Sequence, residues 1–336
     1  MPILPTRYYC TLFDQNYLIK GLTMIRSLAR HSANFRLYVL CMDEVTHRIL
    51  GALALPGLVL IRLEDFEDPD LLRVKQERSR AEYCWTCTPC ILDYVLRLDS
   101  SVDNLTYLDA DLMFFSSPEP IYDEVGGNSV AIIEHRFSAG FEHYAVNGKY
   151  NVQWVTIRRD TDGLETLGWW RDRCIEWCSA VSDGERMGDQ KYLDCWTTRF
   201  ANVHVVANTG AGVAPWNFAT HRFSTWSEGV FVDDKPVIFF HYHGYKMLDD
   251  GGFTPMPKVY IETAPIPYPV YEPYRLALWD ALVEIRLLVP NFTCGMYAAT
   301  PLSSQTHLGS SADSDSSAAA GIRRRLRHLL GKGSSN

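Results

Sequence analysis

The segment NLTYLDADLMFF places two acidic residues directly behind an apolar strand. Residues 105–108 form the predicted strand, and Asp109 and Asp111 follow it. Because strand side chains alternate, we expect both carboxylates to project to the same side. Two carboxylates this close repel each other unless a cation lies between them, and hard oxygen ligands suit Mn²⁺ or Mg²⁺ better than Zn²⁺. The spacing therefore predicts a site for one of these two ions.

A metal of this kind points to a ligand that contains a diphosphate. Mg²⁺-type ions keep open coordination positions, which substrate phosphates can fill. An Asp-x-Asp pair alone is common in surface turns. Here the strand before it, and Phe114, Phe115 and the SSPEP loop after it, resemble the surroundings of the metal in sugar-nucleotide-binding folds, which implies a functional site.

The elements around this pair alternate between strands and helices. Strands are predicted at 8–13, 37–42, 58–63, 105–108, 130–134, 154–157, 204–206 and 237–240. Helices are predicted at 17–29, 45–53, 89–98 and 276–288, the third with Thr88 as its N-cap and Pro89 in its first turn. Such alternation predicts an α/β fold with a mixed, mainly parallel sheet flanked by helices, in which ligands bind at the carboxyl ends of the strands.

Four groups of residues, in order along 7–250, resemble the GT-A nucleotide-diphospho-sugar transferases, in particular glycosyltransferase family eight, which includes glycogenin and bacterial galactosyltransferases. The groups are TLFDQNYLIKGLTMIRSL, YLDADLMFF, the pair KYNVQWVTIRRD and RMGDQKYLDCW, and VIFFHYHGYK. The resemblance implies a GT-A, Rossmann-like fold with a C-terminal helix. It also implies transfer of a sugar from a nucleoside-diphosphate donor, most simply a UDP-linked one, with retention of configuration.

The resemblance assigns roles to particular residues. The loop that grips the uridine corresponds to Thr11, Asp14, Asn16 and Tyr17. The metal motif corresponds to Asp109, Ala110 and Asp111, with His241 completing the metal site. The residues beside the reacting sugar correspond to Asn151, Asp189 and Gln190. The donor diphosphate is assigned Gly244 and Lys246, although Lys246 stands one residue closer than the family lysine usually does.

Several assignments have alternatives. His243 shares the predicted strand face of His241 and is the alternative metal ligand. Gln153 stands where many relatives carry a small residue, which leaves the donor sugar open. An inverting reaction would need a carboxylate base, for which Asp189 or Glu134 are candidates.

Other features favour a structural interpretation. Cys84, Cys87 and Cys90 have a spacing that suits an iron–sulfur cluster or zinc, but no fourth ligand lies nearby in the sequence and a helix start is predicted among them. We therefore expect structural thiols. Arg78 and Arg80 lie near the place of a donor-binding arginine in the family, with a different local length.

Isolated histidines and clustered aromatics carry weaker signals. Three histidines without a partner at ligand spacing receive no role, namely His135, His204 and His221. The aromatic residues in 169–177 and 214–220 suit either core packing or stacking on a sugar.

Composition bounds the function and the location. The 336 residues are 47% hydrophobic with a net charge of −8, which argues against general nucleic-acid binding because such proteins need surplus Lys and Arg. The sequence predicts neither a signal peptide nor a membrane-spanning segment. We therefore expect a cytoplasmic protein, in which the nine cysteines, an odd number, are reduced thiols.

Three regions are predicted along the chain. Residues 1–265 form the catalytic domain, 266–300 a helical extension, and 301–336 a disordered Ser/Ala-rich tail. The tail closes on GIRRRLRHLLGKG, a short basic amphipathic segment that is either solvated or in peripheral contact with the inner face of a membrane.

These observations together predict a metal-dependent glycosyltransferase with a glycan or lipid-linked acceptor. A sugar nucleotidyltransferase is the enzyme alternative, but its usual Gly-rich, Arg- and Lys-containing loop is absent after the first strand, where FDQNYLIKG stands. A non-catalytic scaffold that binds a sugar nucleotide or a polysaccharide is the alternative from another class.

Overall fold

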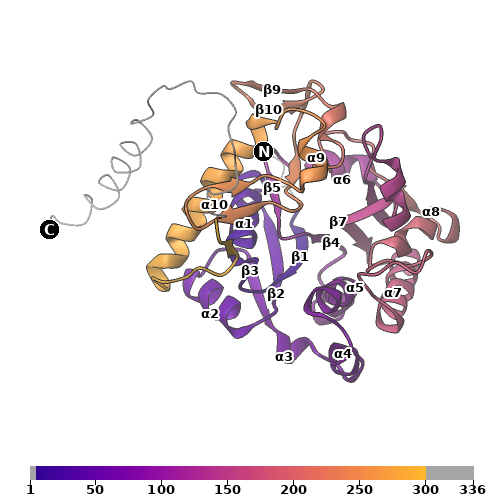
Figure 1. The fold of residues 1–336 in the computed structure, drawn as a ribbon. Coiled ribbons are helices and arrows are strands. Elements are labelled where there is room, and N and C mark those ends of the chain that lie inside the picture. Colours follow the sequence, from indigo (N-terminus) through magenta and orange to yellow (C-terminus); the bar gives the residue numbers. More distant parts are fainter. Residues whose placement is uncertain (1–4, 300–336) are drawn as a thin grey trace, which may run out of the picture. The chain divides into compact units, whose positions relative to one another are not determined.

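A seven-stranded sheet forms the centre of the computed structural model, which describes residues 5–299 (Figure 1). Its strand order is β3-β2-β1-β4-β7-β6-β8. The strands are β1 (Arg7–Phe13), β2 (Phe35–Cys41), β3 (Leu58–Arg62), β4 (Asn104–Leu108), β6 (Val130–Glu134), β7 (Tyr150–Arg158) and β8 (Val203–Val205). Only β7 runs against the others in this sheet. The predicted mixed, mainly parallel sheet is confirmed.

Helices cover both faces of this sheet. They are α1 (Leu18–His31), α2 (Glu44–Leu53), α3 (Leu63–Phe66), α4 (Pro69–Lys75), α5 (Arg80–Leu98), α6 (Glu119–Val125), α7 (Thr161–Glu176), α8 (Trp196–Arg199), α9 (Lys258–Ile261) and α10 (Tyr268–Leu288). The helices α1 and α10 lie on one side of the sheet, and α5 and α7 lie on the other (Figure 1). Along β1, Tyr9 and Phe13 join the core under α1 and α10, whereas Cys10 and Leu12 join the core under α5 and α7. The alternation of a buried strand thus builds two hydrophobic layers.

Gly21 lets α1 lie close to the sheet. A Cβ atom at this position would meet the Phe13 ring at 2.5 Å. Because no side chain can fit there, glycine permits the close approach that holds the first turns of α1 near the end of β1.

Short strands outside the central sheet carry the late part of the chain. They are β5 (Leu112–Phe114), β9 (Phe223–Trp226), β10 (Gly229–Val232), β11 (Lys235–Pro236), β12 (Phe239–His241), β13 (Lys246–Leu248), β14 (Phe253–Thr254) and β15 (Met296–Tyr297). The strand predicted at 237–240 is β12, and it pairs antiparallel with β5. This pairing sets His241 opposite Leu112, the residue after Asp111.

The start predicted for the helix at 89–98 is wrong. Helix α5 begins at Arg80, where the Ser79 hydroxyl accepts a hydrogen bond from the Glu82 backbone amide and the Glu82 carboxylate accepts one from the Ser79 amide. Pro89 lies inside the helix. An interior proline costs about 3 kcal/mol, and full burial of Ile91 and Leu92 contributes about 1.5–3 kcal/mol for each side chain. Core packing therefore outweighs the proline.

The prediction that a helix starts among Cys84, Cys87 and Cys90 is wrong, because all three cysteines lie within α5. Cys87 and Cys90 are buried in the core, and Cys84 is partly exposed. All nine cysteines of the chain lie within residues 5–299 and are free thiols.

Helix α10 packs on α1 (Figure 1). The Thr23 hydroxyl lies 3.4 Å from the Ala277 carbonyl oxygen, and Arg26 forms an ion pair with Glu284. The tail predicted at 301–336, including its basic amphipathic end, lies outside the described residues. Within 5–299, none of the helices combines the length and the apolar character needed to cross a membrane.

Candidate active site and metal centre

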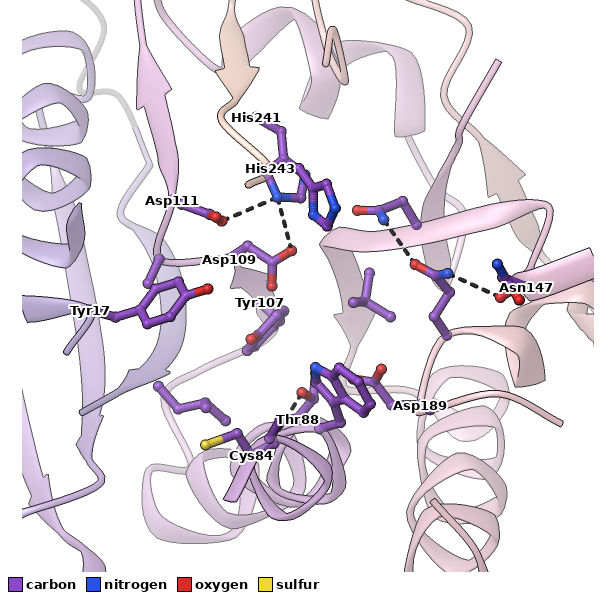
Figure 2. Close-up of a pocket in the computed structure, with 18 of the residues that line it drawn as sticks. Tyr17, Cys84, Thr88, Tyr107, Asp109, Asp111, Asn147, Asp189, His241 and His243 are labelled. Carbon is purple, nitrogen blue, oxygen red and sulfur yellow. Dashed lines mark hydrogen bonds and ion pairs between the residues drawn. The ribbon is translucent and has the colours of Figure 1, made fainter. Parts of the chain in front are cut away.

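Asp109, Asp111 and His241 converge at the carboxyl edge of the sheet (Figure 2). One ligand atom from each lies within 4.8 Å of the others. His241 Nε2 is 3.1 Å from Asp111 Oδ1 and 3.8 Å from Asp109 Oδ2. Within residues 5–299, this is the one group of at least three acidic, His or Cys side chains arranged to hold a metal ion.

The two aspartates converge for a reason other than strand alternation. They lie in the turn between β4 and β5, not in a strand. The Asp109 amide donates to the Gln153 carbonyl on β7 (3.2 Å), and the Asp111 carbonyl accepts from the Tyr242 amide behind β12 (2.9 Å). Backbone hydrogen bonds to two other segments therefore hold the turn that presents both carboxylates.

The protonation preferences of this cluster favour a bound cation. Burial, partly opposed by His241 and reinforced by Asp111, raises the pKa of Asp109 from 3.8 to about 6. Burial alone would lower the pKa of His241, but the two carboxylates outweigh it and the pKa is raised. For Asp111, burial is outweighed by His241 and Lys20, which hold its pKa well below the usual range. Two carboxylate oxygens and one imidazole nitrogen are ligands that a divalent ion can accept, and such an ion would supply the charge that the buried aspartates need.

Lys20 is the cation beside this cluster, and sequence reasoning missed it. Its Nζ lies 3.8 Å from Asp111 Oδ2 and 4.6 Å from the centre of the Tyr17 ring. Burial lowers the pKa of Lys20, opposed by Asp111. Nothing in the sequence marked Lys20, because it is an ordinary polar position in the first turn of α1, and only the packing of α1 on the sheet brings it to the turn after β4.

The loop after β1 forms the neighbouring part of the site. The Asp14 carboxylate accepts hydrogen bonds from the amides of Asn16 (2.8 Å) and Tyr17 (3.3 Å), which starts α1, and it also pairs with Arg80. Asp14, Asn16 and Tyr17 all line the cavity. Arg80, which had only a weak sequence signal, lines it too. Thr11 is fully buried in β1 and is not part of the lining.

Two of the three residues assigned to the reacting sugar, Asn151 and Gln190, form a hydrogen-bonded row in the lining of the cavity. The Asn151 amide nitrogen donates to Gln190 Oε1 (2.8 Å) and lies 3.1 Å from His135 Nε2, while the Gln190 amide nitrogen donates to the Asn147 carbonyl (3.0 Å). Asn151 stands near the beginning of β7, and because β7 is antiparallel to β4 its beginning lies at the carboxyl edge of β4. His135 had no assigned role, and burial lowers its pKa to about 3, so its neutral ring belongs to this row.

Asp189 faces the metal cluster from the far side of the cavity (Figure 2). It is 3% exposed, and its Oδ2 has no hydrogen-bond partner in the described part of the chain. Burial raises its pKa to about 7, with Thr88 opposing and Asp109 adding to the shift. Carboxyl groups whose pKa is strongly raised by burial are often found in functional sites.

The residues assigned to the donor diphosphate lie elsewhere. Lys246 is exposed on β13, with Nζ 5.1 Å from the centre of the Tyr297 ring, and neither it nor Gly244 lines the cavity. Gly244 has φ +74°, and a Cβ there would meet Pro257 Cδ at 2.5 Å, so the turn itself requires a glycine. His243 lines the cavity but is not one of the three clustered ligands.

The cavity measures about 730 Å³ and has an aromatic wall. This wall consists of Phe137, Tyr144, Trp216 and Tyr260. Phe137 stacks on His135 with ring centres 4.7 Å apart, and Trp216 stands perpendicular to His241 at 5.1 Å. Rings of this kind can pack against the apolar faces of sugars. Of the aromatic segments noted in the sequence, 214–220 reaches the cavity, whereas Trp170 is fully buried in the core.

Comparison with known proteins places the chain among relatives. No family model matches the sequence. The uncharacterized protein YfnD of Bacillus subtilis (strain 168) is 32% identical over 293 residues, which cover 86% of this chain and 94% of YfnD. The uncharacterized protein YfnF of the same organism is 31% identical over 297 residues, which cover 85% of this chain and 96% of YfnF.

A solved structure shares the fold. The glycosyltransferase GlyE of Streptococcus pneumoniae TIGR4 superposes with a TM-score of 0.51 and 16% identity, over 85% of this chain and 64% of GlyE. The predicted fold class is confirmed by this likeness and by the sheet topology. The chain therefore belongs to the family of YfnD and YfnF, and it has the GT-A glycosyltransferase fold.

Proposed function

We propose that the protein is a metal-dependent glycosyltransferase that moves a sugar from a nucleoside-diphosphate donor to an acceptor hydroxyl. The observation that carries this proposal is the cluster of Asp109, Asp111 and His241 at the carboxyl edge of a GT-A sheet. Ligands of open α/β sheets bind at this edge. The two carboxylates and the imidazole would hold Mn²⁺ or Mg²⁺, which when bound neutralises the charge of the donor diphosphate.

The donor would bind between the metal cluster and the loop after β1. Asp14, Asn16 and Tyr17 line this part of the cavity and would hold the base and ribose, most simply of a UDP-linked sugar. Lys20, beside Asp111, brings a positive charge near the expected diphosphate, the role that the sequence had assigned to Lys246. A buried cation interacts more strongly than an exposed one because water screens it less.

The transferred sugar would lie between the metal and the row of Asn151 and Gln190. Amide groups in this row can orient the sugar hydroxyls. Asp189 lies on the same side, and its carboxylate would stabilise positive charge at the anomeric carbon. With retention, the acceptor oxygen forms its bond to that carbon on the face from which the phosphate oxygen departs, and the acceptor proton passes to the departing diphosphate.

The acceptor would use the aromatic wall. Phe137, Tyr144 and Tyr260 line the cavity and can pack on sugar rings, which suits a glycan or a lipid-linked glycan acceptor. The cytoplasmic location and the membrane contact of the basic segment at 321–333 stay predictions from the sequence.

The test is turnover of a panel of nucleoside-diphosphate sugars with Mn²⁺, read as nucleotide release with and without oligosaccharide acceptors. We expect release from at least one donor, and loss of release in Asp109→Asn but not in Asp172→Asn, a change at an exposed carboxylate of α7. A non-catalytic scaffold would bind a donor without releasing the nucleotide, and a nucleotidyltransferase would release pyrophosphate from a nucleoside triphosphate and a sugar phosphate. If the protein binds no divalent ion with or without a nucleoside diphosphate, the proposal fails.

A further inference from the structure

Gln153 contacts the outer nitrogen of the candidate metal ligand His241. Gln153 is fully buried in β7, and its Oε1 lies 3.2 Å from His241 Nδ1. The other ring nitrogen, Nε2, is the one that faces Asp109 and Asp111. The two nitrogens of His241 are therefore divided between a neutral amide and the candidate metal site.

This division sets which nitrogen carries the proton. A metal ion bound at Nε2 needs the lone pair of that nitrogen, so the hydrogen of a neutral ring must sit on Nδ1. Nδ1–H then needs an acceptor, and the Gln153 carbonyl oxygen supplies one. If the amide were turned over, its NH₂ group would face Nδ1, which can accept only when the hydrogen sits on Nε2 and blocks the metal.

The amide keeps this orientation at a cost. Gln153 Nε2 is buried and has no hydrogen-bond partner within residues 5–299. Gly212 lies next to this nitrogen, and a Cβ atom at position 212 would come within 3.2 Å of it. A residue without a side chain therefore leaves room for the Gln153 amide. An unmade hydrogen bond at a buried donor costs about 1–3 kcal/mol, and a role in a functional site is one reason for which a fold keeps such a group.

The backbone of Gln153 joins the same site. Its carbonyl accepts from the Asp109 amide (3.2 Å), and its amide donates to Asn151 Oδ1 (2.9 Å). One residue thus connects the turn of the metal cluster, the imidazole ligand and the amide row beside the sugar. Trp216 also contacts the His241 ring, but the edge-to-face packing of its indole supplies no acceptor for Nδ1–H.

We propose that Gln153 is the positioning residue that holds His241 in the Nδ1–H form, with Nε2 directed at the metal. This inference rests on the proposed function because it takes His241 as a metal ligand. Outer partners of metal-bound histidines commonly set ligand orientation, and their loss weakens metal affinity by about 10–100-fold.

The experiment measures Mn²⁺ binding with UDP, by calorimetry and by the pulsed-EPR signal of a nitrogen bonded to Mn²⁺. Gln153→Met removes the acceptor at similar volume, and Gln153→Glu keeps an acceptor oxygen. We expect Gln153→Met to weaken Mn²⁺ binding by about 10–100-fold and to reduce the nitrogen signal, and Gln153→Glu to retain both. Thr166→Val, a change at a buried hydroxyl of α7, serves as the matched control for general destabilisation and should bind Mn²⁺ like the wild type.

Two outcomes would overturn the inference in different ways. If His241→Gln loses the nitrogen signal but Gln153→Met binds Mn²⁺ like the wild type, His241 is a ligand and Gln153 does not position it. If the wild type shows no nitrogen signal, or if His241→Gln leaves it unchanged, His241 is not a ligand and the metal part of the proposed function fails as well. If Gln153→Met shows no unfolding transition in a urea titration and is therefore unfolded from the start, Gln153→Leu gives the same comparison.

Discussion

Asp189→Asn should make the protein more stable at alkaline pH while it removes activity. Asp189 is 3% exposed, and burial is the largest cause of its pKa of about 7, against 3.8 for an ordinary aspartate. A raised pKa in the folded state means that the fold favours the protonated carboxyl. This stability contribution is complete below the unfolded pKa near 3.8 and is lost as the pH rises through about 7.

The size of the effect follows from the two pKa values. Each pKa unit corresponds to about 1.4 kcal/mol. Relative to a side chain that does not titrate, Asp189 should therefore lower the stability by roughly 4 kcal/mol at pH 8 and by roughly 1.5 kcal/mol at pH 5. At pH 5 the loss arises because the carboxyl group is ionised in the unfolded state and protonated in the folded state. Asparagine has nearly the same shape and no charge, so the variant avoids this cost. A functional residue that destabilises its own fold is a common compromise in enzymes.

The assay is urea unfolding of wild type and Asp189→Asn at pH 5 and pH 8, in the presence of a chelator so that no metal alters the local charge. We expect the variant to have a higher free energy of unfolding than the wild type at both pH values. This difference between variant and wild type, the stability gap, should be larger at pH 8 than at pH 5 by about 2–3 kcal/mol. Asp172→Asn, at an exposed carboxylate, should show no such growth of the gap. A gap that is the same at pH 5 and pH 8 would show that Asp189 is solvated or paired, and the reasoning would be refuted.

Three further predictions concern the metal and the donor. Asp109→Asn should reduce transfer at least about 100-fold because it removes a ligand charge, while circular dichroism shows an intact fold; near-normal turnover would exclude Asp109 as a ligand. Mn²⁺ affinity, measured by calorimetry, should fall as the pH drops through about 6, where Asp109 takes up a proton that competes with the metal. His241, whose pKa is raised above its usual 6.5, should add proton competition at higher pH already; a flat profile would contradict this. Lys20→Met should weaken binding of UDP with Mn²⁺ about tenfold, about 1.4 kcal/mol, and more than Lys246→Met. Neither lysine lines the cavity, but Lys20 lies 3.8 Å from Asp111, whereas Lys246 is exposed on β13; the reverse order would restore the sequence-based assignment.

Local sequence patterns predicted most of the elements in the first half of the fold. The strands β1 to β4 and the helices α1 and α2 agree with the periodicity of apolar residues to within a few positions. The acidic pair after β4 could be located because a buried strand followed by two carboxylates is a local signal. The start of α5 could not be located, because Pro89 is a strong local sign of a helix start. The helix extends on both sides of Pro89 because it is buried against β1 and α7, and these contacts involve residues distant in the sequence.

Partners that are distant in the sequence account for what was missed at the site. His135 carries no pattern of its own, and it gains its place through Asn151 on the neighbouring strand β7. Lys20 looks like any polar position of an amphipathic helix until α1 is packed on the sheet. Gln153 appeared only as a departure from relatives, and its contact with His241 crosses from β7 to β12.

The sequence by itself determined the α/β class and the location of the acidic pair, because these depend on residue types a few positions apart. Only the tertiary structure decided between His241 and its alternative His243, and it showed which lysine lies beside the aspartates and which amide contacts the imidazole. The antiparallel pairing of β12 with β5 sets His241 opposite Leu112 and so next to Asp111. That register comes from the packing of two short strands far apart in the chain, and no local preference specifies it.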